Sequence, residues 1–291
     1  MPQKSYAPYL LLFPALALAG FVLLFPLAQV ITMAASDVSR FGKITGWNTL
    51  ANFSKVFADP SFWTALWNTF IWTGTVVAGT VAVSIPVAII LNQPFAGRSI
   101  ARVLVMLPWS VSLSMSAIVW LWALDGEIGY VNKLLSDLGL PWGHVQWLSQ
   151  PGPAFVAVIC VGIFVSIPFT VTVLLGGLSS IPDDVYEAAA LEGANGVQRF
   201  MRITLPLLRP FLNLVLVLNV INVFNSFPII WVMTAGGPSD QTHILVTYLY
   251  QLAFRLGRLG EASAISIIML ALLVVFTAIY LRLIPKEPQH A

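Results

Sequence analysis

The segment Ser179–Pro210, with the sequence SSIPDDVYEAAALEGANGVQRFMRITLPLLRP, is a polar stretch between two long apolar runs. It carries four of the chain's twelve acidic residues, Asp183, Asp184, Glu187 and Glu192. The flanking runs are long enough to cross a membrane, which takes about 20 apolar residues. A polar segment between two spans must lie in water. It therefore gives a fixed point from which the spans on either side can be placed.

The first half of this segment predicts a short helix. Ser180 is expected to cap it, with Asp183 completing a capping box and Pro182 in the first turn, where its missing N–H is no loss. The alanines 188–190 favour helix strongly. Gly193 is expected to end the helix in the left-handed conformation.

The second half predicts another short helix over residues 196–203. Asn195 is expected to cap this helix, which should break before Pro206 because proline disfavours helix at the residue before it. In an arbitrary membrane protein, the plainest interpretation of such a segment is a solvated helix-turn-helix loop.

The composition indicates a polytopic membrane protein. Of 291 residues, 58% are hydrophobic and 9% are charged, whereas soluble domains carry roughly 25% charged residues. The formal net charge of +2 is too small to indicate nucleic-acid binding. Cys160 is the one cysteine and the three histidines are scattered, so we expect no disulfide framework and no metal site.

Runs without charged residues place the membrane spans, because a charge at the bilayer centre costs at least ~2.5 kcal/mol. The first apolar run, at about residues 9–33, is near 25 residues long, whereas the apolar core of a signal peptide has roughly 7–15 residues. An uncleaved span is therefore expected there. A shorter uncharged piece, Gln241–Phe254, should be interfacial or re-entrant. Six spans are predicted at about 9–33, 66–91, 102–124, 154–178, 210–234 and 262–284.

The predicted fold is therefore an all-α polytopic membrane protein with six transmembrane helices. Residues 1–65 should form the N-terminal span and the first extracellular loop, and residues 66–284 should form the core. With both termini on one side, that side holds eight basic and five acidic residues, while the other holds six and seven. The positive-inside rule then puts both termini, the loop 179–209 and the tail 285–291 in the cytoplasm.

Several classes of function are disfavoured by what the sequence lacks. No predicted span carries Asp, Glu, Lys, Arg or His in its interior, whereas proton- and ion-coupled carriers usually need such groups. A membrane enzyme would need an acid, a base or a metal. No G-x-x-x-x-G-K-[ST] sequence is present, so ATP binding through a Walker A loop is excluded. Energy for uphill transport must then come from another subunit.

Neutral polar residues inside the spans are the candidates for a substrate path. Asn219, Asn222 and Ser226 fall at helical spacing on one face of the fifth span. Such groups can line a wetted path, or they can simply hydrogen-bond between helices or to their own backbone. Amides with nearby aromatic rings suit a neutral polyhydroxylated ligand. The full candidate set is Asn219, Asn222, Asn225, Ser226, Ser112, Ser116, Ser166 and Thr170.

Glu187-Ala188-Ala189, then Gly193, then Ile203-Thr204-Leu205-Pro206 resembles the EAA loop of ABC importer permeases. One departure is visible, because Glu192 stands where that family usually has aspartate. The resemblance implies that this loop couples the permease to an ATPase, with Glu187 facing the ATPase and Gly193 turning the chain into the docking helix. The implied coupling residues are Glu187, Ala188, Ala189, Glu192, Gly193, Ala194 and Pro206.

Further pieces resemble the carbohydrate-type permeases related to the maltose and glycerol-3-phosphate importers. Together with the loop they cover the chain from about residue 8 to 284. The matching pieces are Asn52-Phe53, Phe62-Trp63, Asn68-Thr69, Leu107-Pro108, Gly129-Tyr130-Val131-Asn132, Gly236-Gly237-Pro238 with Thr242 and Tyr248, and Gly260 with Ala262-Ser263-Ala264.

The resemblance implies a MetI-like ABC importer permease core with an extra N-terminal helix, in a bacterial or archaeal plasma (inner) membrane. It implies a second permease subunit in a heterodimer, two cytoplasmic ATPases that hold the ATP and Mg²⁺, and an extracellular solute-binding protein. The expected solute is a di- or oligosaccharide or a polyol, imported by alternating access. Glycerol 3-phosphate or a related phosphorylated solute is the alternative, and a carrier or channel that works alone is a third hypothesis.

Overall fold

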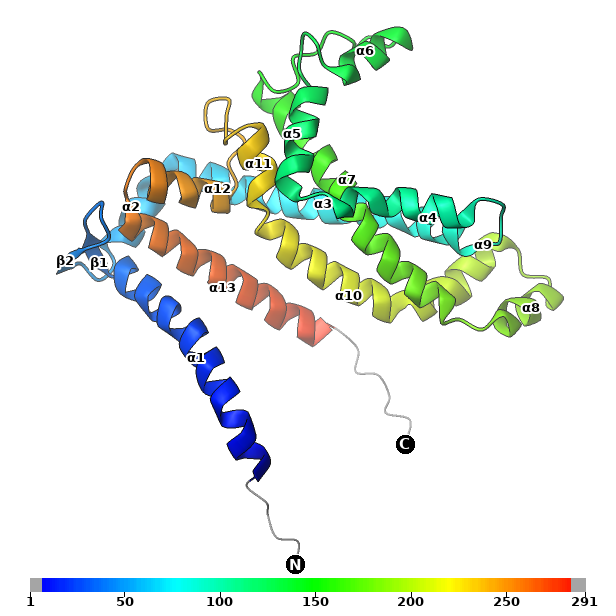
Figure 1. Cartoon of the computed structure of the whole chain (residues 1–291), viewed down its shortest axis with the longest axis horizontal. Coiled ribbons are helices and arrows are strands. Elements are labelled where there is room, and N and C mark those ends of the chain that lie inside the picture. The colour runs from blue at the N-terminus through cyan, green and yellow to red at the C-terminus, as the bar shows by residue number, and fades with distance from the viewer. Residues whose placement is uncertain (1–6, 284–291) are drawn as a thin grey trace, which may run out of the picture. The chain divides into compact units, whose positions relative to one another are not determined.

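The computed structural model describes residues 7–283, so the predicted tail 285–291 lies outside it (Figure 1). The chain divides into two compact units. Unit 1 holds the described residues up to Trp63 together with Tyr248–Val275. Unit 2 holds Thr64–Thr247 and the described residues from Phe276 onward.

Within residues 7–283, five helices are long and apolar enough to cross a membrane, or six if a bent pair counts as one span. They agree with the predicted spans at 9–33, 66–91, 154–178 and 262–284, apart from a few residues at each end. The long helices are α1 (Ala7–Ala34), α3 (Pro60–Asn92), α7 (Pro151–Ser179), α10 (Leu205–Phe224) and α13 (Leu259–Leu283).

The third span, predicted as one helix at 102–124, is broken. It consists of α4 (Arg98–Met106), η1 (Leu107–Ser110) and α5 (Leu113–Ala123), and the two arms are bent by 98°. Pro108 lies in the first turn of η1, where its missing N–H is no loss. Ser112 then caps α5 by accepting a hydrogen bond from the Met115 N–H at 3.3 Å.

The fifth span, predicted as one helix at 210–234, is also broken. Helix α10 ends at Phe224, and α11 (Phe227–Met233) begins after the extended residue Ser226. Pro228 lies in the first turn of α11, which places the break just before it. The hydrophobicity of the two runs does not reveal either break. The residues at the breaks, Ser112, Asn225 and Ser226, are of types that can occupy helical or cap positions.

Unit 2 is built around α7, which packs against α10, α11, α4, α5 and η1. Trp72 of α3 is fully buried in its core, and its indole N–H donates to the Val223 carbonyl at 2.8 Å. Gly162 of α7 allows this close packing, since a Cβ there would lie 2.6 Å from the Trp72 ring. The tryptophan therefore joins α3 to the last turn of α10, directly before the second break.

Unit 1 contains a small cap of irregular structure at the C-terminal end of α1. The cap includes a two-stranded antiparallel sheet that the sequence did not indicate, β1 (Ser36–Val38) and β2 (Ile44–Trp47), followed by α2 (Ala51–Ala58). The Asn52 amide is buried and donates to the carbonyls of Ala34 and Ser36 at 3.0 and 2.8 Å. These bonds satisfy backbone groups that the end of α1 leaves without helical partners.

The Asp59 carboxylate and the Tyr248 hydroxyl form a second link inside unit 1. The Tyr248 hydroxyl donates to Asp59 at 2.6 Å. Burial raises the pKa of Asp59, but hydrogen bonds from Tyr248 and Ser61 outweigh it and hold that pKa below its ordinary value. Burial and the neighbouring carboxylate both raise the pKa of Tyr248. The charged form of Asp59 is therefore the one that stabilises the folded unit.

Replacing Tyr248 by phenylalanine removes this charge-assisted bond and should lower the stability of the detergent-purified protein by about 1–2 kcal/mol at pH 7. A carboxylate with a lowered pKa stabilises the fold above its unfolded pKa and loses that contribution as the pH falls through its folded pKa. The difference in melting temperature between Tyr248→Phe and wild type should therefore shrink below about pH 4. Tyr130→Phe, at an exposed position, is the control, and an equal loss in both variants would contradict the assignment.

Candidate functional site

A cavity of about 550 Å³ in unit 2 is the main candidate site. Both helix breaks open onto it, because residues 111–113 of the first break and 225–226 of the second line its wall. The remaining wall comes from α3, η1, α7, α10 and α11. Inside a membrane, backbone that leaves the helical conformation is tolerated where it lines a cavity or is covered by protein.

Six of the eight predicted path residues line this cavity. They come from the first break, from α7, and from α10 with the start of α11. No charged side chain lies among the residues of the lining, so the wall presents amides, hydroxyls and aromatic rings. The six are Ser112, Ser166, Asn219, Asn222, Asn225 and Ser226.

The other two predicted residues, Ser116 and Thr170, do not line the cavity. Thr170 is fully buried, and its hydroxyl accepts a hydrogen bond from the Asn219 amide at 2.9 Å. Ser116 is buried within α5. For Thr170 the alternative of a hydrogen bond between helices is the correct one, and this bond holds the Asn219 amide in place.

The amides of the cavity differ in how firmly they are held. Asn219 is tied to Thr170, and the Asn225 amide donates to the Ile221 carbonyl at 2.9 Å. Asn222 is exposed on the cavity side of α10 and makes no side-chain hydrogen bond among the described residues. Its donor and acceptor are the ones most available to a solute.

Sequence reasoning missed the aromatic part of the wall. Trp72, Trp109 and Phe169 all line the cavity, and the Trp109 and Phe169 rings lie 6.1 Å apart. Flat rings of this kind pack against the C–H faces of sugars. The available signal for Trp109 was the resemblance of Leu107-Pro108 to the carbohydrate-type permeases, because these two residues start the turn η1 that carries Trp109 into the wall.

The predicted coupling segment forms a hairpin of two helices, as expected. Helix α8 (Asp183–Leu191) is followed by its C-cap residue Glu192. Gly193 then takes the left-handed conformation with a φ of 80°. Helix α9 (Gly196–Arg199) is capped by Asn195, which forms a capping box with Gln198. The expected roles of Gly193 and Asn195 in the local structure are therefore confirmed.

Two local predictions for this segment are wrong. The Ser180 hydroxyl does not cap α8 but donates to the Gly177 carbonyl at the end of α7, and Pro182 occupies the cap position. The second helix does not break before Pro206. It continues from α9 through the π-helical turn η2 (Phe200–Thr204) into α10, and the wider turn accommodates the proline that lacks an N–H.

Most of the predicted coupling residues lie on the surface of the hairpin. Glu187, Ala188, Glu192, Gly193 and Pro206 are exposed, whereas Ala194 is half-buried and Ala189 is buried against the rest of the unit. The Tyr186 hydroxyl is 3.0 Å from the Thr204 hydroxyl. This bond ties α8 to the start of the α10 span, so a displacement of α8 can reach the span that lines the cavity.

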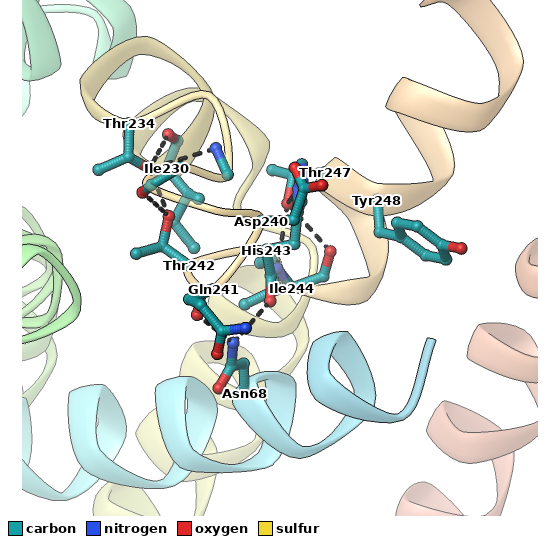
Figure 2. Close-up of polar contacts among 12 residues, drawn as sticks. Asn68, Ile230, Thr234, Asp240, Gln241, Thr242, His243, Ile244, Thr247 and Tyr248 are labelled. Atoms are coloured by element: carbon teal, nitrogen blue, oxygen red, sulfur yellow. Dashed lines mark hydrogen bonds and ion pairs between the residues drawn. The ribbon is translucent and has the colours of Figure 1, made fainter. Parts of the chain in front are cut away.

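The loop Thr234–Thr247 contains several of the residues that resemble the carbohydrate permeases, and Figure 2 shows how they are held. The Asn68 amide of α3 donates to the carbonyls of Gln241 and His243 at 2.8 and 3.1 Å. The buried His243 lies 3.0 Å from the Thr247 hydroxyl and 3.4 Å from the Asp240 carboxylate. The Asn68 amide, at a matched position, therefore fixes the loop on α3.

Comparison with known proteins places this geometry in a family. Residues 80–287 match the family model described as "Binding-protein-dependent transport system inner membrane component". A "Probable ABC transporter permease protein" of Brucella suis biovar 1 (strain 1330) is 57% identical over 99% of both chains. The "Trehalose/maltose transport system permease protein MalF" of Thermococcus litoralis is 34% identical over 96% of this chain and 94% of its own.

The fold also matches a solved structure. A chain of a bacterial ABC transporter involved in the import of the acidic polysaccharide alginate superposes with a TM-score of 0.82 at 24% identity, covering 97% of this chain and 98% of that one. At this identity the likeness establishes the fold. It agrees with the expected helical membrane permease.

Cysteine labelling should separate the cavity wall from the buried polar residues. In a Cys160→Ser background, Asn222→Cys should react with a membrane-impermeant maleimide, because Asn222 faces the cavity. Thr170→Cys should be protected, because Thr170 is fully buried. Equal reactivity of the two variants, with both properly inserted, would contradict the assignment of the cavity wall.

Proposed function

Because this chain belongs to the family of inner membrane components of binding-protein-dependent transport systems, we propose that it is the permease subunit of an ABC importer for a neutral sugar or polyol. A permease of this kind is a transport subunit and not an enzyme. The proposed solute is a di- or oligosaccharide or a polyol, and the proposed mechanism is alternating access driven by ATP hydrolysis on separate subunits.

The composition of the cavity wall carries the proposal for the solute. A volume of about 550 Å³ lies within the roughly 300–1,000 Å³ typical of sites for small molecules. Amides and hydroxyls can both donate and accept hydrogen bonds, as a polyhydroxylated solute requires. The trehalose/maltose relative supports the same class of solute.

A phosphorylated or otherwise anionic solute is less well supported by this wall. Such a solute would gain from arginine or lysine, which bind phosphate through charge-assisted hydrogen bonds. None of the residues that line the cavity is basic. The neutral solute is therefore the one that the described geometry favours.

The exposed hairpin of α8 and α9 supports the proposed coupling to an ATPase. Leu191 and Val197 are 90% and 70% exposed at its tip, and Glu187 is exposed beside them. An exposed apolar tip with a carboxylate nearby is suited to a protein partner. We propose that two ATPase subunits, which hold the ATP and Mg²⁺, dock on this chain and on a second permease subunit.

Substitution of Asn222 tests the solute path. Asn222→Leu removes the available amide and places an apolar side chain in the cavity. A solute hydroxyl that loses its hydrogen-bond partner there costs about 1–3 kcal/mol. Uptake of a neutral disaccharide into proteoliposomes should therefore fall about ten-fold or more. Assembly should be retained because the Asn222 side chain makes no bond to be lost. Cys160→Leu, at an exposed position of α7 outside the lining, is the matched control. Unchanged uptake by Asn222→Leu would exclude this path.

Charge reversal at Glu187 tests the coupling segment independently. Glu187→Lys should abolish the stimulation of ATP hydrolysis by the binding protein and solute, while the purified complex stays assembled. Asp137→Lys reverses an exposed charge on α6 (Tyr130–Asp137) and should leave the stimulation unchanged. Full stimulation in Glu187→Lys would remove the role proposed for this hairpin.

A further inference from the structure

The irregular cap of unit 1 concentrates positive charge at one end of two spans. We define the cap as residues 36–59 and 248–261. Five of the six basic residues predicted outside the cytoplasm lie in it, against three acidic residues, which is contrary to the usual depletion of basic residues on that side. The five are Arg40, Lys43, Lys55, Arg255 and Arg258.

The acidic residues of the cap are mostly engaged within it. Glu261 is buried and accepts two hydrogen bonds from the Arg258 guanidinium, the one from Nε at 2.9 Å. Asp59 accepts from Tyr248. Among the described residues, no carboxylate lies within ion-pair distance of the exposed Lys55 ammonium.

A polar pocket of about 380 Å³ lies inside this cap. Lys55, Arg258 and Asp37 are among the residues that line it. The two N–H groups of Arg258 that face Glu261 hold the guanidinium in place and leave about three donors for another acceptor. The Asp37 carboxylate accepts a hydrogen bond from the Asn48 amide at 2.8 Å and keeps further lone pairs for another donor.

Two glycines allow close packing around the pocket, between α2 and the start of α13. Gly260 lines it, and a Cβ there would lie 2.6 Å from the Asn52 amide. Gly257 has a φ of 69°, and the Arg40 side chain lies directly against it. The Arg40 side chain is therefore packed against the residue that precedes Arg258.

The pocket lies close to the ends of two helices that are long enough to span a membrane. Its lining begins at Asp37, shortly after the end of α1, and includes Gly260 and Glu261 at the start of α13. The cap also carries exposed aromatic side chains, with Phe41 at 96%, Trp47 at 74% and Phe254 at 70%. Aromatic and basic residues together at the end of a span are typical of contact with lipid headgroups.

We propose that this pocket binds the headgroup of a glycerophospholipid, in the leaflet that the charge bias predicts to be the outer one. The phosphate lies between Lys55 and Arg258, with Arg40 at the rim, and the distal end of the headgroup donates a hydrogen bond to Asp37. The chemistry selects phosphatidylethanolamine or phosphatidylglycerol, whose ends carry N–H or O–H donors. It disfavours phosphatidylcholine, whose quaternary ammonium has none.

Native mass spectrometry of the purified transporter complex with dioleoyl lipids tests this proposal. Phosphatidylethanolamine and phosphatidylglycerol should be retained in preference to phosphatidylcholine. Lys55→Gln should weaken their retention about five-fold, since a basic residue near a membrane surface contributes about 1 kcal/mol. Asp37→Asn should reduce the preference for phosphatidylethanolamine and phosphatidylglycerol over phosphatidylcholine, because the acceptor loses its charge and the hydrogen bond is weakened. Lys133→Gln, an exposed basic residue outside the cap, should change nothing.

Three results would overturn the proposal. The first is equal lipid retention in wild type, Lys55→Gln and Asp37→Asn. The second is displacement of the lipid by millimolar inorganic phosphate, which would indicate a site for free anions. The third is unchanged lipid retention in Lys55→Gln together with lost stimulation of ATP hydrolysis by the binding protein, which would assign the basic cap to protein docking.

Discussion

The cost of leaving backbone N–H and C=O groups unsatisfied in hydrocarbon is the constraint on which this structure depends. The chain leaves the helical conformation at two places in unit 2, between α4 and α5 and between α10 and α11. Both breaks face one cavity lined by amides and hydroxyls. The irregular backbone and the polar wall therefore have a common explanation, because each provides partners for the other and for water or a solute between them.

Asparagine amides have a recurring role where the chain leaves the helical conformation. Asn52 satisfies the end of α1, and Asn68 holds the loop that follows α11. In the loop 125–150, the Asn132 amide donates to two carbonyls at 3.0 Å and its oxygen accepts from Trp147 at 2.7 Å. One amide can satisfy a donor and an acceptor at once, which suits segments without a regular hydrogen-bond ladder.

The positions of the spans could be predicted because excluded charge is a strong and local signal. The breaks were not predicted, because an apolar run does not show whether Ser112 and Ser226 take cap or helical positions. Pro108 and Pro228 were the local signals for the two breaks. The failure at Ser180 has the same origin, because its hydroxyl bonds to the preceding turn. Six cavity residues were found from their helical spacing, whereas Trp109 was missed because the turn that exposes it lies inside an apolar run.

The proposed discrimination between a neutral and an anionic solute rests on the uncharged wall of the cavity. The most direct measurement is ATP-driven uptake by the reconstituted transporter, with its binding protein, of a neutral disaccharide and of the same disaccharide carrying one phosphate. Uptake of the neutral sugar, with little or none of the phosphorylated one, is the result expected from a cavity without basic residues. Efficient uptake of the phosphorylated sugar alone would contradict the assignment of this cavity as the path of a neutral solute.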